Sequence, residues 1–269
     1  MTEPHFWRVE RRSVRAAEIA AFGITTFSIG VSEVQAGLLA LAATRDAAIY
    51  QSSDGSIANG AGRYLFAGKT NQNLARRSLL HFDVASALPN GAEITAVRLT
   101  LNLSQVNGGS GARDVSLHLA LSPWTTGASN PADTESLGGP ALAGDCTWLH
   151  ANADGIGGGT LWETAGGDFA AFASASVTTQ AVGLYTWSSL GLLNDVRLFA
   201  ADPSRNNGWF LLGDESAAGT ARRFDSADSA TEGGVVPVLE IEYSIVPAPG
   251  PVALLALAAL LAPRRKRRV

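Results

Sequence analysis

Hydrophobic and polar residues alternate with a period of two along several stretches of this chain, which is the pattern of half-buried β-strands. The clearest stretch is 94–104, which places four apolar residues on one face: Val97, Leu99, Leu101 and Leu103. The same alternation runs through 78–84, 115–121 and 239–243, and weaker strand patterns occur at 47–51, 64–67, 185–188, 209–212 and 222–225. Together these strands predict an all-β fold, an antiparallel β-sandwich.

One short amphipathic helix is expected within this series of strands. Its apolar residues recur at helical spacing, and the segment ends at a proline: Leu192, Leu193, Val196, Phe199, Ala200 and then Pro203. We expect this helix to cap the sandwich.

A long crossover from 122 to 183 is rich in Gly, Ala, Ser and Thr and shows little periodicity. It contains Trp124, Trp148 and Trp162, half of the six tryptophans. Structureless loops of this length are rare inside a compact domain. We therefore expect the crossover to fold back on the domain and bury these rings.

The N-terminal 42 residues have the order of a secretory signal. Four arginines between positions 8 and 15 precede an apolar stretch at 19–31, whose length suits the hydrophobic region of such a signal. Val34-Gln35-Ala36 and Ala40-Leu41-Ala42 both fit a cleavage site. The chain is therefore expected to be exported; the alternative is an uncleaved membrane anchor.

The C-terminal segment 246–269 has three parts. A helix-averse hinge containing Pro247, Pro249 and Gly250 is followed by an apolar run at 252–262 and by five cations, Arg264, Arg265, Lys266, Arg267 and Arg268. The run is shorter than the roughly 20 apolar residues that span a bilayer, so we expect an apolar helix that enters the membrane transiently, its cations on the cytoplasmic side. A soluble helix with a basic tail is the alternative.

This layout resembles the PEP-CTERM sorting tail of Gram-negative bacteria, with Ala248 at the centre of its Pro-Glu-Pro signal. The resemblance implies recognition and cleavage by an intramembrane exosortase, after a transient inner-membrane stage in the secretion machinery. It also implies a location at the cell surface or in the extracellular matrix.

Charge is unevenly distributed. Residues 44–245 hold 11 of the 20 cations and 20 of the 24 acids, so the formal net charge of this span is 11 minus 20, or −9. Such an acidic domain argues against nucleic-acid binding. It favours a neutral glycan over an anionic one, unless four arginines gather into a basic patch: Arg76, Arg77, Arg222 and Arg223.

Residues 43–245 carry a second resemblance. Their motifs, taken in order, are similar to the DNRLRE domain family of extracellular bacterial proteins: Thr44-Arg45-Asp46-Ala47-Ala48-Ile49-Tyr50, Arg76-Arg77-Ser78-Leu79-Leu80-His81-Phe82-Asp83-Val84, Asp145-Cys146-Thr147-Trp148-Leu149-His150, Gly166-Gly167-Asp168-Phe169, Gly208-Trp209-Phe210-Leu211-Leu212 and Ala221-Arg222-Arg223-Phe224-Asp225-Ser226. The resemblance implies a jelly-roll sandwich related to carbohydrate-binding modules, with a polysaccharide as its partner.

No Gly-x-Ser-x-Gly elbow, His-Glu-x-x-His motif or phosphate loop is present, so we expect a noncatalytic glycan-binding or structural protein without a cofactor. The alternative is a polysaccharide lyase or glycosidase, or its accessory module. Trp124, at the end of a predicted strand, is the preferred stacking platform for a sugar ring, with burial of the ring as the alternative. Arg77 and Arg222 are further ligand-binding candidates.

Three loop carboxylates, Asp145, Asp154 and Asp168, are candidate oxygen ligands for a structural Ca²⁺; the competing interpretation is that they cap turns. Cys146, the single cysteine, cannot form an intramolecular disulfide and is expected to be a small packed side chain.

Overall fold

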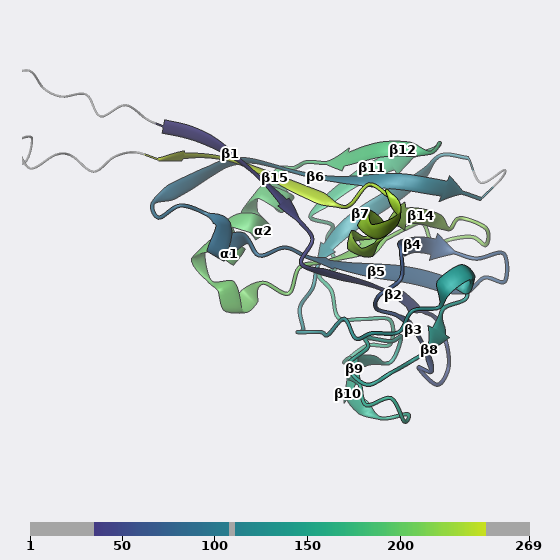
Figure 1. Cartoon of the computed structure of the whole chain (residues 1–269). Helices are drawn as coiled ribbons and strands as arrows, with labels where there is room; N and C mark the ends of the chain where they lie inside the picture. The colour runs from purple at the N-terminus through teal and green to yellow at the C-terminus, as the bar shows by residue number, and fades with distance from the viewer. Residues whose placement is uncertain (1–34, 108–110, 246–269) are drawn as a thin grey trace, which may run out of the picture. The chain divides into compact units, whose positions relative to one another are not determined.

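A computed structural model describes residues 35–107 and 111–245, which form a curled, mostly antiparallel β-sheet with few helices (Figure 1). Its strands are β1 (Gln35–Ala42), β2 (Arg45–Tyr50), β3 (Ile57–Asn59), β4 (Tyr64–Lys69), β5 (Ala75–His81), β6 (Ala92–Val106), β7 (Arg113–Leu119), β8 (Gly139–Pro140), β11 (Ala175–Thr179), β12 (Gly183–Trp187), β13 (Trp209–Leu212), β14 (Arg222–Asp225) and β15 (Val238–Ile245). All the strongly predicted strands are therefore present. The predicted segments 1–34 and 246–269 lie outside the described residues.

The long strand β6 organises one part of the sheet. It pairs with β15 along its first half, with β14 near its end and with β12 on its other side. The predicted alternation is confirmed, because Leu99, Leu101 and Leu103 have no exposed surface while Thr100 and Asn102 are partly exposed. The buried residues join side chains of β4, β7, β13 and β15 in the main hydrophobic cluster.

The sheet curls at strand β4, which pairs with two different strands. This strand pairs with β14 through residues 64–67 and with β5 through Gly68 and Lys69. Gly68 has a φ of +107°, and a Cβ there would lie 3.0 Å from the carbonyl oxygen of Thr220. A side chain at this position would therefore be strained where the strand changes partners.

Strand β5 differs from the predicted half-buried strand because both of its faces are covered. Leu80 packs into the main cluster, whereas Leu79 packs into a second cluster together with rings from the crossover. The strand also ends at His81, earlier than expected. The carboxylate of Asp83 accepts a hydrogen bond from the backbone N–H of Ser86 and begins the short helix α1 (Val84–Ala87), so Val84 is helical.

The predicted helix is confirmed as α2 (Leu190–Ala201), which contacts β6. Ser189 caps it by accepting a hydrogen bond from the N–H of Leu192 at 3.0 Å. Its buried residues are Leu192, Leu193, Val196 and Phe199, and the helix ends before the 3₁₀ turn Pro203–Arg205. No helix in residues 35–107 and 111–245 is long and apolar enough to cross a membrane.

The crossover folds back over β2, β5 and β13 as expected. Trp124, Trp148 and Trp162 are at most 8% exposed and pack with Phe210 of β13 in the second cluster. The crossover also forms the hairpin β9 (His150–Ala153) and β10 (Gly159–Leu161), a separate two-stranded sheet at the lower edge of Figure 1. Short 3₁₀ turns complete the described fold at Ala132–Thr134 and Ala227–Glu232.

Candidate functional site

The described residues contain a hollow of about 330 Å³ whose lining has cations and amides but no acid. We call it the arginine–amide hollow and define it by six of its lining side chains: Asn71, Gln72, Arg76, Gln105, Arg222 and Arg223. In a domain with a net charge of −9, a carboxylate-free hollow of this kind concentrates positive potential locally. Three of the four arginines of the predicted basic patch therefore line one hollow.

Strand pairing brings these residues together from distant parts of the chain. In β14, Arg223 lies opposite Phe66 of β4 on one side and Gln105 of β6 on the other. In β5, Arg76 lies opposite Gly68 of β4. Because β4 joins β14 to β5, the arginines of two strands far apart in sequence line the same hollow.

Arg76 is a buried cation that forms no ion pair with a carboxylate of the described residues. It is 6% exposed, and its guanidinium carbon lies 4.7 Å from the centroid of the Tyr50 ring. One Nη donates to the carbonyl oxygen of Ala75 at 3.0 Å, while Nε has no hydrogen-bond partner in the described residues. Burial lowers the pKa of Arg76 below its usual value, opposed by Tyr50. A charge held in this way is costly unless an anion compensates it.

Arg223 is more accessible and contributes a second cation. Its guanidinium carbon lies 3.8 Å from the centroid of the Tyr64 ring, and its Nε donates to the hydroxyl of Ser104 at 3.2 Å. Among the described residues it forms no ion pair with a carboxylate. The stacked ring fixes the plane of the guanidinium and leaves donors for a ligand.

Arg222, a predicted ligand-binding residue, lines the hollow but faces inward. It is 1% exposed, and its guanidinium donates to the Thr179 hydroxyl at 3.2 Å and to the carbonyl oxygens of Thr220 at 3.2 Å and Gly111 at 2.6 Å. Its backbone belongs to β14, where consecutive side chains point to opposite faces. Arg222 therefore adds charge beneath the hollow, and its contacts tie three chain segments together.

Arg77, the other arginine predicted to bind a ligand, does not line the arginine–amide hollow. It points to the opposite face of β5, where Nε and one Nη each donate to the Glu215 carboxylate at 2.8 Å. Its other Nη donates to the carbonyl oxygen of Gly166, and its guanidinium carbon lies 4.7 Å from the Trp148 ring centroid. These contacts hold the crossover against the sheet.

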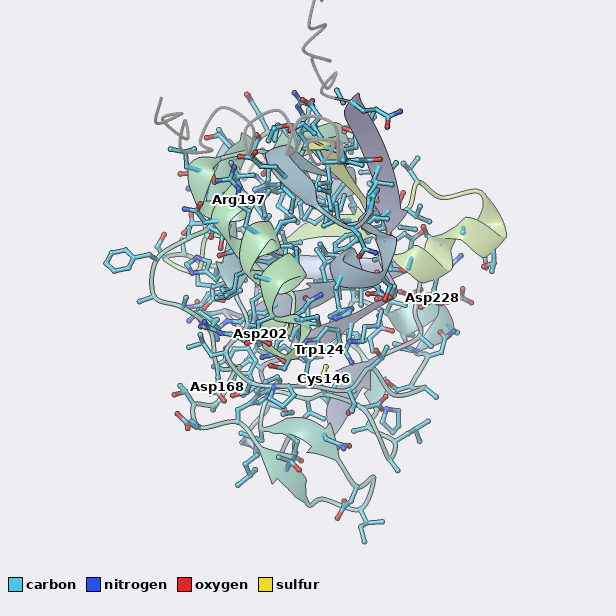
Figure 2. All side chains as sticks on the ribbon, turned by 90° about the vertical axis from the view of Figure 1, so that its left-hand side faces the viewer. Trp124, Cys146, Asp168, Arg197, Asp202 and Asp228 are labelled. Atoms are coloured by element: carbon cyan, nitrogen blue, oxygen red, sulfur yellow. The ribbon has the colours of Figure 1, made fainter. Side chains whose placement is uncertain are left out.

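Trp124 is not a stacking platform, because its ring is 2% exposed and lies inside the molecule (Figure 2). The indole N–H donates to the carbonyl oxygen of Asn207 at 2.7 Å, and the guanidinium carbon of Arg45 lies 4.7 Å from the ring centroid. The residues after the predicted strand turn inward with the crossover. Cys146 packs in the same cluster, as expected.

The three candidate calcium ligands cap separate turns. Asp145 accepts from the N–H groups of Ser129 and Leu142. The other two carboxylates cap neighbouring loops: Asp154 accepts from the N–H groups of Ile156 and Gly158, and Asp168 from those of Glu163 and Thr164 and from the Ser122 hydroxyl. No group of three metal-binding side chains occurs within the described ranges. The structure thus shows the capping arrangement and does not bring the three together.

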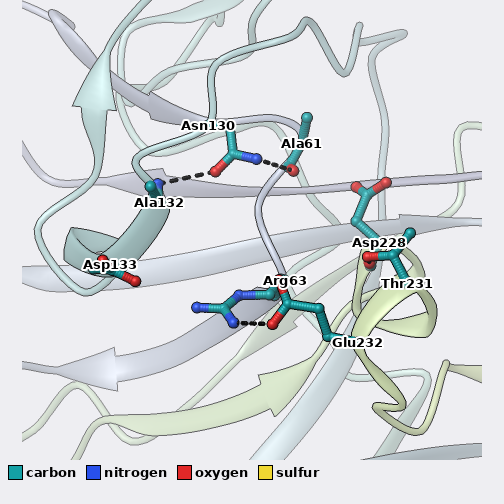
Figure 3. Close-up of a pocket in the computed structure, with 8 residues that line it drawn as sticks. All are labelled: Ala61, Arg63, Asn130, Ala132, Asp133, Asp228, Thr231 and Glu232. Carbon is teal, nitrogen blue, oxygen red and sulfur yellow. Dashed lines mark hydrogen bonds and ion pairs between the residues drawn. The ribbon is translucent and has the colours of Figure 1, made fainter.

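A second hollow, of about 370 Å³, surrounds Arg63 and is rich in acids (Figure 3). Arg63 donates to the Glu232 carboxylate and, through Nε, to buried Glu135 at 3.2 Å. Asp133 and Asp228 lie nearby in the lining. The cation here is already paired with two carboxylates, so it fastens the turn at 227–232 to the crossover and is not available to an anionic ligand.

Sequence reasoning named Arg76 only as part of a conditional patch and missed Gln72 and Gln105. One feature of the sequence points to these arginines. Arg76-Arg77 and Arg222-Arg223 are adjacent pairs in strands, so in each pair the two side chains point to opposite faces of the sheet. Nothing in the sequence indicates that the two amides belong with them, because the contact depends on which strands pair.

No protein-family model matches the chain, and no curated protein is significantly similar to it.

Proposed function

We propose that this chain is an exported, noncatalytic protein of the bacterial cell surface or extracellular matrix, and that it binds polysaccharide through the arginine–amide hollow. The observation that carries this proposal is buried Arg76 in a carboxylate-free lining; among the described residues its Nε has no hydrogen-bond partner and the side chain forms no ion pair. An anionic group would give this cation the partner that the described residues lack. The preferred ligand is therefore a polysaccharide with carboxylate-bearing sugars, which replaces the initial preference for a neutral one.

The other lining groups suit the remainder of a sugar ring. Side-chain amides such as Gln72 and Gln105 both donate and accept hydrogen bonds, as sugar hydroxyls do. The stacked guanidinium of Arg223 presents planar donors that match the two oxygens of a carboxylate. Charge and hydroxyl recognition are thus combined in one hollow.

The finer architecture and the sorting route are part of the same proposal. The curled sheet, whose distant strands share one core, supports a jelly-roll sandwich related to carbohydrate-binding modules. The signal-like residues before Gln35 and the PEP-CTERM-like tail after Ile245 support export and processing by an exosortase in a Gram-negative bacterium. A sorted, polysaccharide-binding domain would attach its ligand to the cell surface or matrix.

The test uses two polymers with the same backbone, polygalacturonate and its fully methyl-esterified form, in which the ester groups remove the negative charge. We expect the purified full-length chain to bind the acidic polymer in calorimetric titration, with affinity that falls as salt is raised. Arg76→Gln and Arg223→Gln should each weaken binding by about tenfold or more, the effect of losing a charged hydrogen bond. Arg205→Gln, which removes an exposed cation of the 3₁₀ turn after α2, should bind as the unmodified chain does.

Thermal melting separates ligand binding from a structural role of Arg76. Removing an uncompensated buried charge should leave the melting temperature unchanged or raise it. A lower melting temperature together with weaker binding would assign Arg76 to the fold. Failure of the unmodified chain to bind either polymer would overturn the proposal, and new reducing ends in the incubated polymer would favour the enzyme alternative.

A further inference from the structure

A third hollow, of about 370 Å³, lies between the loop before β3 and the β9–β10 hairpin. We name it the His150 hollow and define it by six lining residues: Asp54, Ser56, Pro140, Ala141, His150 and Ile156. We infer that it is a second subsite of the same polysaccharide, which takes an uncharged sugar residue next to the acidic residue held by Arg76. This inference rests on the proposed function and extends it.

His150 is a buried side chain whose proton position is fixed by its neighbours. The Thr147 hydroxyl oxygen accepts hydrogen bonds from the N–H groups of Leu149 at 3.2 Å and His150 at 3.0 Å. Both of its acceptor positions are then used, so its single hydrogen is donated to Nδ1 of His150, 3.1 Å away. In the neutral imidazole, Nδ1 therefore accepts and the ring proton is carried by Nε2.

The Nε2–H of His150 is a donor without a partner among the described residues. The side chain is 4% exposed, and it lines the hollow. Gly55, at a φ of +64°, lies against the ring, and a Cβ there would be 3.0 Å from Nδ1. The absence of a side chain at this position lets the loop pack on the imidazole. The Nε2–H of the ring can then donate a hydrogen bond to a ligand oxygen.

The rest of the lining selects an uncharged ring. The Asp54 carboxylate accepts from the N–H of Ser56 at 3.1 Å, and these Ser56 hydrogen bonds lower the pKa of Asp54, so it is negative at neutral pH. It can accept from a sugar hydroxyl but repels a second carboxylate. Pro140, Ala141 and the 91% exposed Ile156 offer apolar surface for the C–H face of a sugar.

The two hollows are linked by one short segment of the chain. Ser136 and Leu137 line the arginine–amide hollow, and Pro140 and Ala141 line the His150 hollow. The three residue steps from Leu137 to Pro140 span at most about 10 Å. A single polysaccharide strand can therefore occupy both hollows, with an acidic residue in one and an uncharged residue in the other.

The experiment compares three galacturonate hexamers: fully acidic, about half methyl-esterified and fully methyl-esterified. Two unlike subsites predict that the full-length chain binds the half-esterified hexamer tightest, about tenfold better than the acidic one, because it satisfies both hollows. Ser56→Trp should fill the His150 hollow and abolish this preference while leaving affinity for the acidic hexamer unchanged. Ser53→Trp, an exposed neighbour outside the lining, is the matched control and should keep the preference.

A second pair of variants tests the donor itself. His150→Asn retains a polar atom for Thr147 but lacks Nε2–H, so it should lose the preference for the half-esterified hexamer. His150→Gln, which places an N–H near that position, should restore part of it. If Ser56→Trp keeps the full preference, or the unmodified chain shows none while binding the acidic hexamer through Arg76, the second subsite is wrong and the proposed function stands. If no hexamer binds, both are wrong.

Discussion

Asp46 shows how burial of a single residue makes the stability of this fold depend on pH. The side chain lies in β2, is 3% exposed and accepts a hydrogen bond from the N–H of Ala227 at 2.7 Å. Burial raises the pKa of Asp46 from 3.8 to about 7, with the nearby charge of Asp228 acting in the same direction. The folded chain thus keeps a proton that the unfolded chain has released above its ordinary pKa.

The sign of the effect follows from this proton. Between about pH 4 and 7 the folded state binds more protons than the unfolded state, so Asp46 makes the free energy of unfolding fall as pH rises. Asp46→Asn retains an acceptor for Ala227 and removes the titration, so its melting temperature at pH 8 should exceed that of the unmodified chain. Calorimetric melting at pH 4 and pH 8 measures the difference, and a variant that is less stable at pH 8 contradicts the assignment.

His81 has the opposite effect on the pH dependence of stability in the same pH range. Burial, and then the charge of Arg45, lower its pKa from 6.5 to about 4, so its contribution to stability is lost as pH falls from 6.5 toward 4. In the Asp46→Asn variant this dependence on pH should remain visible, and stability should rise between pH 4 and 6.5. Adding His81→Gln should flatten it.

At the scale of elements, two substitutions in β6 test which residues of the strand face the core. Leu101 has no exposed surface and belongs to the main cluster, whereas the Thr100 hydroxyl lies 2.9 Å from that of Thr186 on the outer face. Leu101→Asp should cost several kcal/mol, because it buries an unpaired charge, while Thr100→Asp should cost less than about 1 kcal/mol. Urea unfolding measures both; equal losses would show that the assigned faces are wrong.

At the scale of the whole molecule, the ends of the described domain and the arginine–amide hollow lie at opposite ends of β6. Gln35 of β1 pairs with Ile245 of β15, which pairs with Ala92 at the start of β6. Gln105 and Val106, at the other end of β6, line the hollow. Fourteen residue steps of a strand correspond to about 45 Å. Attachment at these chain ends would present the hollow at the far end of the domain.

The pairing of β1 favours one of the two candidate signal cleavage sites. Residues 35–42, assigned from sequence to the export segment, form a strand opposite Val238–Ile245, and Leu39 and Leu41 pack against the main cluster. We expect cleavage after Ala36 and not after Ala42, so that most of β1 remains and β15 stays covered. N-terminal sequencing of the mature protein checks this.

Truncated chains provide the matching stability measurement. A chain that begins at Gly37 should melt close to one that retains all of β1. A chain that begins at Ala43 should lose about 2 kcal/mol, since two half-buried leucines and the edge pairing are removed. A mature terminus at Ala43, or equal stability of the two truncated chains, would contradict this assignment.

Sequence alone determined the features that depend on neighbouring residues. The period of two in 94–104, the helical spacing from Leu192 to Phe199 and the proline that follows fix local backbone geometry, and each element formed where predicted. Burial of Trp124, Trp148 and Trp162 was also expected, because large apolar rings rarely remain in contact with water.

Only the tertiary structure decided which polar groups meet. Arg76 and Arg223 share a hollow because β4 pairs with both of their strands, and Arg77 lies apart because alternate side chains point to opposite faces. The three aspartates cap separate turns of the crossover and do not come together. These contacts join residues far apart in sequence, so local patterns contain no information about them; they arise from the pairing order of the strands.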